Sequence, residues 1–256
     1  MEATVETKFD SPEILNGIPG INWNGYEPSG GQGWHDEYVN SLRPKIDGSL
    51  VELKATAAGY EKERTRLASL GKCAKEAQRL CERIQSIVAD SGAACLDPGV
   101  QEWLAATARL AGQSFSVPAR DAEGFRLISE DIKFLSAFKE YVEADFALDR
   151  VLFALYQVDA RYKMKLFRCA LRMCREIDVS RAVIRNSRSL LLKYFAVGGF
   201  SDFFELMDNA YGRLSVGLRK LKKLVDRQGV SALDATEFAG RDLKAEARRL
   251  FAGYAA

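Results

Sequence analysis

The stretch of this 256-residue sequence that most constrains its fold runs from Glu130 to Tyr194. Aromatic residues at helical spacing are typical of a buried core rather than of a cofactor site. We therefore expect a long helix over residues 130–176 that begins after Ser129 and either kinks or continues at residues 178–180. Its apolar side chains recur at the three- and four-residue spacing of one helical face: Ile132, Leu135, Phe138, Tyr141, Val142, Leu148, Leu152 and Leu155.

Basic residues in the middle of this stretch follow the same helical period. Five of them are separated by steps of 4, 3, 4 and 3 residues: Arg161, Lys165, Arg168, Arg172 and Arg175. At about 100° per residue they lie within about 40° of a common line along the helix. Apolar residues flank this line on both sides: Tyr162, Leu166, Cys169 and Met173 on one, and Met164, Phe167, Leu171 and Cys174 on the other. The pattern predicts a helix that is mostly buried, with a narrow cationic strip exposed.

Three further arginines, Arg181, Arg185 and Arg188, repeat the same step after a break at residues 178–180. We include all eight basic residues in a candidate polyanion-binding strip. A solvated helix face is the simpler interpretation, because long arginine side chains also cover apolar neighbours. Two features favour binding. Almost no glutamate alternates with the cations, and arginine, the better bidentate phosphate donor, outnumbers lysine.

The remaining helical patterns predict an all-α protein, an elongated helical bundle with two long helices. We expect a bundle domain over residues 47–256, preceded by an extended and largely irregular N-terminal arm over residues 1–46. The first long helix is expected over residues 47–91, where small and apolar residues recur at helical spacing and no proline occurs. Its length favours an elongated bundle or a coiled coil.

Shorter elements connect and follow the long helices. Asp97-Pro98 is a strong helix start, and it predicts a connector helix over residues 99–112 that crosses one end of the bundle. Gly198-Gly199 predicts a tight turn between two helices. Asp202 and Asp234 are each followed three residues later by glutamate, which predicts the starts of two tail helices.

The arm (residues 1–46) contains four of the six prolines and a cluster of glycines, which disfavours regular structure. It is also too apolar to remain a disordered tail. Its Trp23, Tyr26 and Trp34 must be covered, either by the body of the same chain or by a neighbouring subunit. The second alternative makes these three residues candidates for self-association. A short helix that begins near Trp34 would end before Pro44.

The sequence offers no recognisable catalytic, metal-binding or cofactor-binding motif, so we expect no enzyme activity, no cofactor and no small-molecule substrate. The one histidine, His35, cannot build a multi-histidine metal site, and the five cysteines are not spaced as a zinc or redox motif. The polar N-terminus is not a signal peptide, and no stretch reaches the roughly 20 apolar residues of a membrane span. We expect an intracellular location, cytoplasmic or within a virion, with free thiols.

These features lead to an expected function: a non-catalytic, self-assembling scaffold whose arginine-rich strip contacts a polyanion. The net charge is only +2, so the basic character is local. Nucleic acid phosphates, as in a virus-like nucleoprotein or filament, are the first expected partner, together with further copies of the chain in a homo-oligomer. The alternatives are a peripheral bundle that binds anionic lipid or senses membrane curvature, and a cytosolic adaptor or chaperone for an acidic protein.

Overall fold

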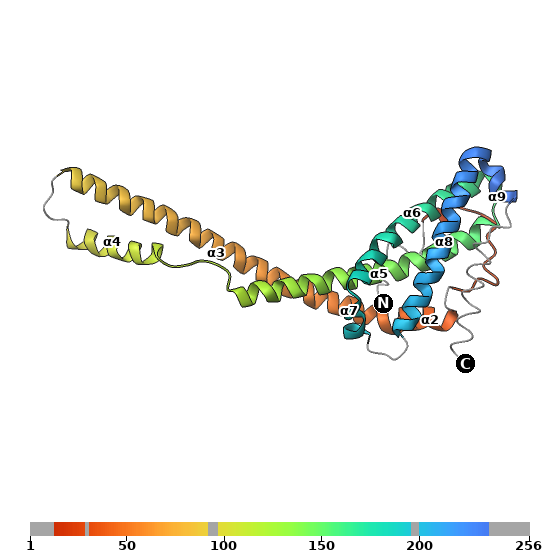
Figure 1. Ribbon diagram of the computed structural model, residues 1–256, viewed down its shortest axis with the longest axis horizontal. Helices are drawn as coiled ribbons and strands as arrows, with labels where there is room; N and C mark the ends of the chain where they lie inside the picture. The colour runs from red at the N-terminus through yellow and green to blue at the C-terminus, as the bar shows by residue number, and fades with distance from the viewer. Residues whose placement is uncertain (1–12, 29–30, 92–96, 196–199, 236–256) are drawn as a thin grey trace. The chain divides into compact units, whose positions relative to one another are not determined.

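The computed structural model describes residues 13–28, 31–91, 97–195 and 200–235 (Figure 1). All regular elements in these residues are helices, so the predicted all-α bundle of long helices is confirmed. The chain divides into two compact units. We call residues 1–50 with 131–256 the core unit and residues 51–130 the hairpin unit. The arm thus belongs to the core unit and is not a separate region.

Two long helices, α3 (Arg43–Ser91) and α5 (Ala119–Leu155), contribute to both units, and α4 (Pro98–Ala111) belongs to the hairpin unit. The other elements belong to the core unit: α1 (Glu13–Asn16), α2 (Gln32–Glu37), the π-helix η1 (Tyr38–Leu42), α6 (Ala160–Asn186), α7 (Arg188–Tyr194), α8 (Phe200–Gln228), the 3-10 helix η2 (Gly229–Ser231) and α9 (Ala232–Ala235).

Helix α5 is central to the core unit. Every residue from 141 to 149 is buried, as expected for a helix that other elements cover on all sides. Helix α6 packs against it, and the Ser180 hydroxyl donates to Glu140 Oε2 at 3.3 Å. Helix α8 also reaches it, with the rings of Tyr141 and Phe204 5.5 Å apart. The core is therefore formed mainly by α5, α6 and α8.

The helix predicted over residues 130–176 is two helices. Between α5 and α6 the chain reverses, and Asp159 is extended (φ −60°, ψ 154°) before the first turn of α6. This reversal lets the two apolar faces pack on each other, which one straight helix could not do. Helix α5 also begins earlier than expected, so Ser129 is not a cap, and its hydroxyl donates to the Phe125 carbonyl at 2.8 Å. Helix α6 is continuous through residues 178–180.

The prediction that Pro44 stops the N-terminal helix is also wrong. Residues 32–91 are helical throughout, and Pro44 is the second residue of α3. The wider π turn of η1 lies immediately before it, where the Arg43 N–H donates to the Tyr38 carbonyl. A wide turn at this point loosens the helical hydrogen-bond ladder just where proline lacks a donor.

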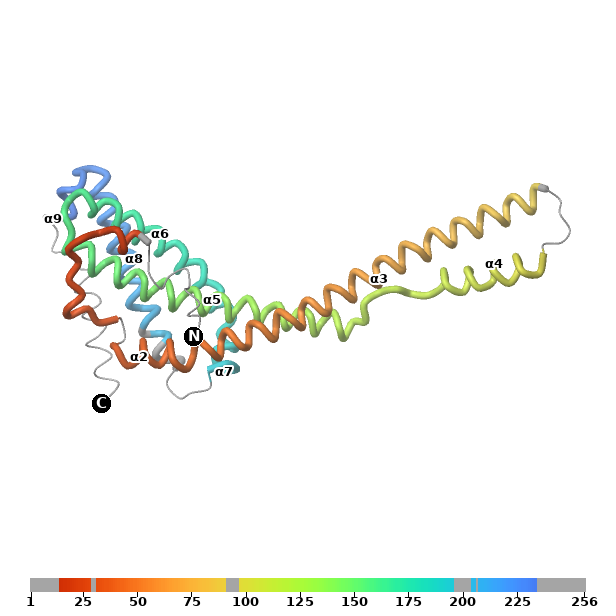
Figure 2. The backbone as a smooth tube through the Cα atoms, turned by 180° about the vertical axis from the view of Figure 1, so that it is seen from behind, coloured from red at the N-terminus to blue at the C-terminus, as the bar shows by residue number. Residues whose placement is uncertain are grey.

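In the hairpin unit, α4 lies beside α3 and runs antiparallel to it, as Figures 1 and 2 both show. The expected start of α4 is confirmed, since the Asp97 side chain accepts a hydrogen bond from the Gly99 N–H at 2.8 Å. Its expected course is not, because α4 follows α3 and does not cross one end of a bundle. Residues 121–128, expected as a separate turn, are part of α5.

Some expected features fall outside the described residues. These are the turn at Gly198-Gly199 and the side chains of Asp202 and Asp234.

Candidate functional site

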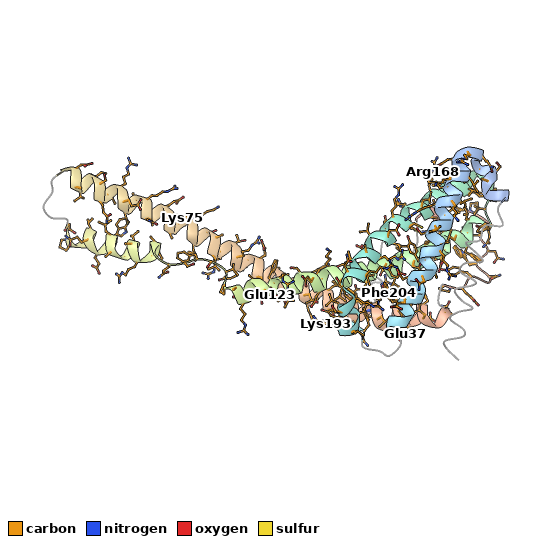
Figure 3. The ribbon with its side chains drawn as sticks, in the orientation of Figure 1. Glu37, Lys75, Glu123, Arg168, Lys193 and Phe204 are labelled. Carbon is orange, nitrogen blue, oxygen red and sulfur yellow. The ribbon has the colours of Figure 1, made fainter. Side chains whose placement is uncertain are left out.

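The five basic residues of the candidate strip lie on one continuous helix, α6, and all five are exposed: Arg161, Lys165, Arg168, Arg172 and Arg175. Arg168 is labelled in Figure 3. At 1.5 Å per residue, the strip extends over about 21 Å. This is the exposed cationic line that the spacing predicts.

The side chains that flank the strip anchor α6 in the core. Leu166 and Phe167 are completely or almost completely buried, and Cys169, Met173 and Cys174 are buried as well. A helix held in this way presents its exposed residues at fixed positions, because rotation about its axis would expose apolar surface. The strip is therefore preorganised for a ligand with regularly spaced charges.

Carboxylates do little to neutralise the strip. Lys165, Arg168 and Arg175 make no ion pair within the described part of the chain. The Arg172 guanidinium donates only to Cys169 Sγ, at 3.9 Å. Arg161 lies 3.3 Å from Asp159, but both side chains are largely exposed, and such pairs contribute little. The strip therefore keeps most of its positive charge available.

Three arginines must be removed from the candidate strip. The helix continues unbroken from Arg175 to Arg181, and a step of six residues turns it by about 240°. Arg181 and Arg185 therefore lie on the face turned toward α8, where both donate to the Asp208 carboxylate. Arg188, at the start of α7, pairs with Glu205. All three are intramolecular ion-pair partners.

Asp208 is the centre of this pairing and is buried. Arg181 Nη2 also donates to the Asp208 carbonyl at 3.0 Å, and the guanidinium lies over the ring of Tyr211, 5.1–5.3 Å away at most positions of a cation–π contact, here 5.2 Å. The Tyr211 hydroxyl donates to the Cys174 carbonyl at 2.6 Å. The sequence gives no sign of this network, because a carboxylate on one helix does not show which arginine on another it faces.

The three aromatic residues proposed for self-association contact their own chain. The ring of Trp23 stacks on Phe153 of α5 at 5.7 Å, and the Tyr26 ring lies 5.3 Å from the same phenylalanine. Trp34 lies 6.4 Å from the ring of Tyr38. In this structure the arm docks on the core unit of the same chain. A role of these residues in self-association stays a prediction.

Burial raises the pKa of the Cys174 thiol from 9.0 to about 12. In the unfolded chain the thiol ionises near its ordinary value, so above about pH 9 the unfolded state binds fewer protons than the folded state. The free energy of unfolding should therefore fall between pH 9 and 12, by up to about 1.4 kcal/mol per pH unit for this thiol. Urea unfolding from pH 8 to 11 measures this, and Cys174→Ala should show a shallower decline. Equal declines would contradict this assignment.

No protein-family model matches the chain, and the comparisons find no similar curated protein and no similar solved structure. Among the described residues, no helix is long and apolar enough to cross a membrane, and no group of three or more His, Cys, Asp or Glu side chains is placed to hold a metal ion. Function must therefore be inferred from the residues themselves.

Proposed function

We propose that this chain is a non-catalytic, self-assembling scaffold protein that contacts nucleic acid phosphates through the strip on α6. The observation that carries the proposal is the exposure of Arg161, Lys165, Arg168, Arg172 and Arg175 along one line of an anchored helix, with little neutralisation by carboxylates. A solvated helix face usually mixes charges of both signs, and this one does not.

The geometry of the strip suits a phosphate backbone. Successive cations are three or four residues apart, which places them about 4.5–6 Å apart along the helix. Along its length of about 21 Å, one strand of a B-form duplex presents about six phosphates at 3.4 Å intervals. Arginine and lysine can contact such phosphates without reading the bases, so binding should depend little on base sequence.

The surroundings of the strip disfavour base stacking. Proteins that bind single strands usually provide aromatic side chains as stacking platforms. The nearest aromatic residue, Tyr162, is only partly exposed, and its ring is occupied by the Arg161 guanidinium at 4.8 Å. Contacts to phosphate, rather than to bases, are therefore the proposed mode of binding.

A purification experiment tests this function. Protein prepared in low salt should carry nucleic acid, seen as a raised ratio of absorbance at 260 nm to that at 280 nm, and should lose it in high salt. Co-sedimentation with vesicles serves as the comparison. Binding that requires anionic lipid, without nucleic acid binding, would contradict the proposal and favour a peripheral membrane protein.

A further inference from the structure

The hairpin unit exposes large apolar side chains next to its interhelical seam. The seam contains Ala74, Cys81 and Val88 of α3 with Leu104 and Ala111 of α4, and these residues are buried or partly buried. Five exposed residues lie beside it: Cys73, Leu80, Ile87, Trp103 and Leu110. We call these five residues the apolar face. Leu80, Ile87, Trp103 and Leu110 are each 45% exposed or more.

Helical geometry places the five residues on one side of the hairpin. Each of them immediately precedes a seam residue, as Leu80 precedes Cys81 and Trp103 precedes Leu104. In an antiparallel helix pair, positions at the same offset from the seam lie on the same side of the pair. The five side chains therefore form one stripe, in which residues from α3 and α4 alternate along the hairpin.

The other side of the hairpin is different in character. The residues of α3 that follow its seam positions are polar and exposed: Lys75, Gln78, Glu82 and Gln85. An amphipathic helix pair with only one seam buries little apolar area, and helices of this kind usually complete a core with further helices. The apolar face therefore has the composition of a surface that another helical element covers.

The charges on its rim indicate what that element is. On α3, the exposed Glu76 and Arg83 lie seven residues apart, and on α4 the exposed Glu102 and Arg109 do the same. In the antiparallel pair, Gly71 lies against Phe115 and Tyr60 against Phe125. This register places the midpoint of the first acid–base pair level with the midpoint of the second.

A two-fold axis through this level makes the surface complementary to itself. Glu76 of each copy then faces Arg83 of the other, and Glu102 faces Arg109. In the apolar face Leu80 meets its own counterpart, while Ile87 lies opposite Cys73. We propose that a second copy of this chain covers the apolar face, so that two hairpins form an antiparallel four-helix arrangement with isologous contacts. This inference supplies the self-association part of the proposed function and does not depend on the strip of α6.

Analytical ultracentrifugation of the full chain over a range of concentrations, free of nucleic acid, tests this interface. The wild type should sediment as a dimer. Leu80→Glu places two carboxylates together at the axis and should weaken the dimer at least 100-fold. Leu192→Glu introduces the same change at an exposed position of α7 and should leave the dimer intact. A monomeric wild type, or a dimer unaffected by Leu80→Glu, would overturn the proposal.

A charge exchange on the rim tests the two-fold axis itself. Glu76→Arg places two arginines together in each of two symmetry-related contacts and should weaken the dimer about tenfold. Arg83→Glu should do the same with two glutamates. The double variant E76R/R83E restores opposite charges and should regain most of the wild-type affinity. Additive losses in the double variant would rule out this pairing. Either outcome leaves polyanion binding by α6 unaffected, so the two proposals can fail separately.

Discussion

Replacing Arg168, Arg172 and Arg175 together with glutamate should weaken binding to duplex nucleic acid on the order of 1,000-fold. The change removes three of five phosphate contacts and places three carboxylates against the phosphates. The fold should persist, because all three positions are exposed and glutamate favours helix. Filter binding gives the affinity, and circular dichroism verifies that the helix content is unchanged.

A matched variant separates this site from a general effect of charge. K72E/K75E/R79E changes the net charge by the same amount at exposed positions of α3, with the same helical spacing. These positions lie outside both the strip and the apolar face. This control should keep its affinity within about tenfold of the wild type. Equal losses in the two triple variants would show that the strip is not a specific site.

Asp208→Ala should lower the free energy of unfolding by about 3 kcal/mol. Asp208 is buried, and its removal leaves the largely buried Arg181 without its main carboxylate partner. Asp178, 4.0 Å from Arg181, is too distant to replace it fully. Urea denaturation followed by circular dichroism measures the change.

The nearby pair of Arg188 and Glu205 provides the comparison. Its side chains are 64% and 49% exposed, so Glu205→Ala should cost less than about 1 kcal/mol. Similar costs for both substitutions would mean that the Asp208 network is as solvated as a surface ion pair. In that case its arginines would again be available to a ligand.

Periodicity predicted the part of the molecule that depends on one helix alone. The 4, 3 steps correctly place Arg161 to Arg175 on one exposed line, because side-chain positions around a helix follow directly from residue number. The same rule misplaced Arg181 and Arg185. The sequence did not decide whether the helix continues through residues 178–180, and continuity turns these arginines toward α8.

Features that depend on two helices were beyond sequence reasoning. The reversal between α5 and α6 is marked by no glycine or proline, and the apolar pattern continues on both sides of Asp159. Likewise, Leu80 and Trp103 belong to one face only when α3 and α4 are known to pair antiparallel and in a given register. Pairing of this kind is set by tertiary packing, which local spacing does not encode.

The dependence of nucleic acid affinity on salt tests the central claim most directly. Five phosphate contacts predict a slope of about −4.5 in a plot of log K against log salt concentration, or a loss of roughly 500-fold between 50 and 200 mM. The R168E/R172E/R175E variant should show a much shallower slope. A wild-type affinity that does not change with salt would contradict the assignment of α6 as a phosphate-binding strip.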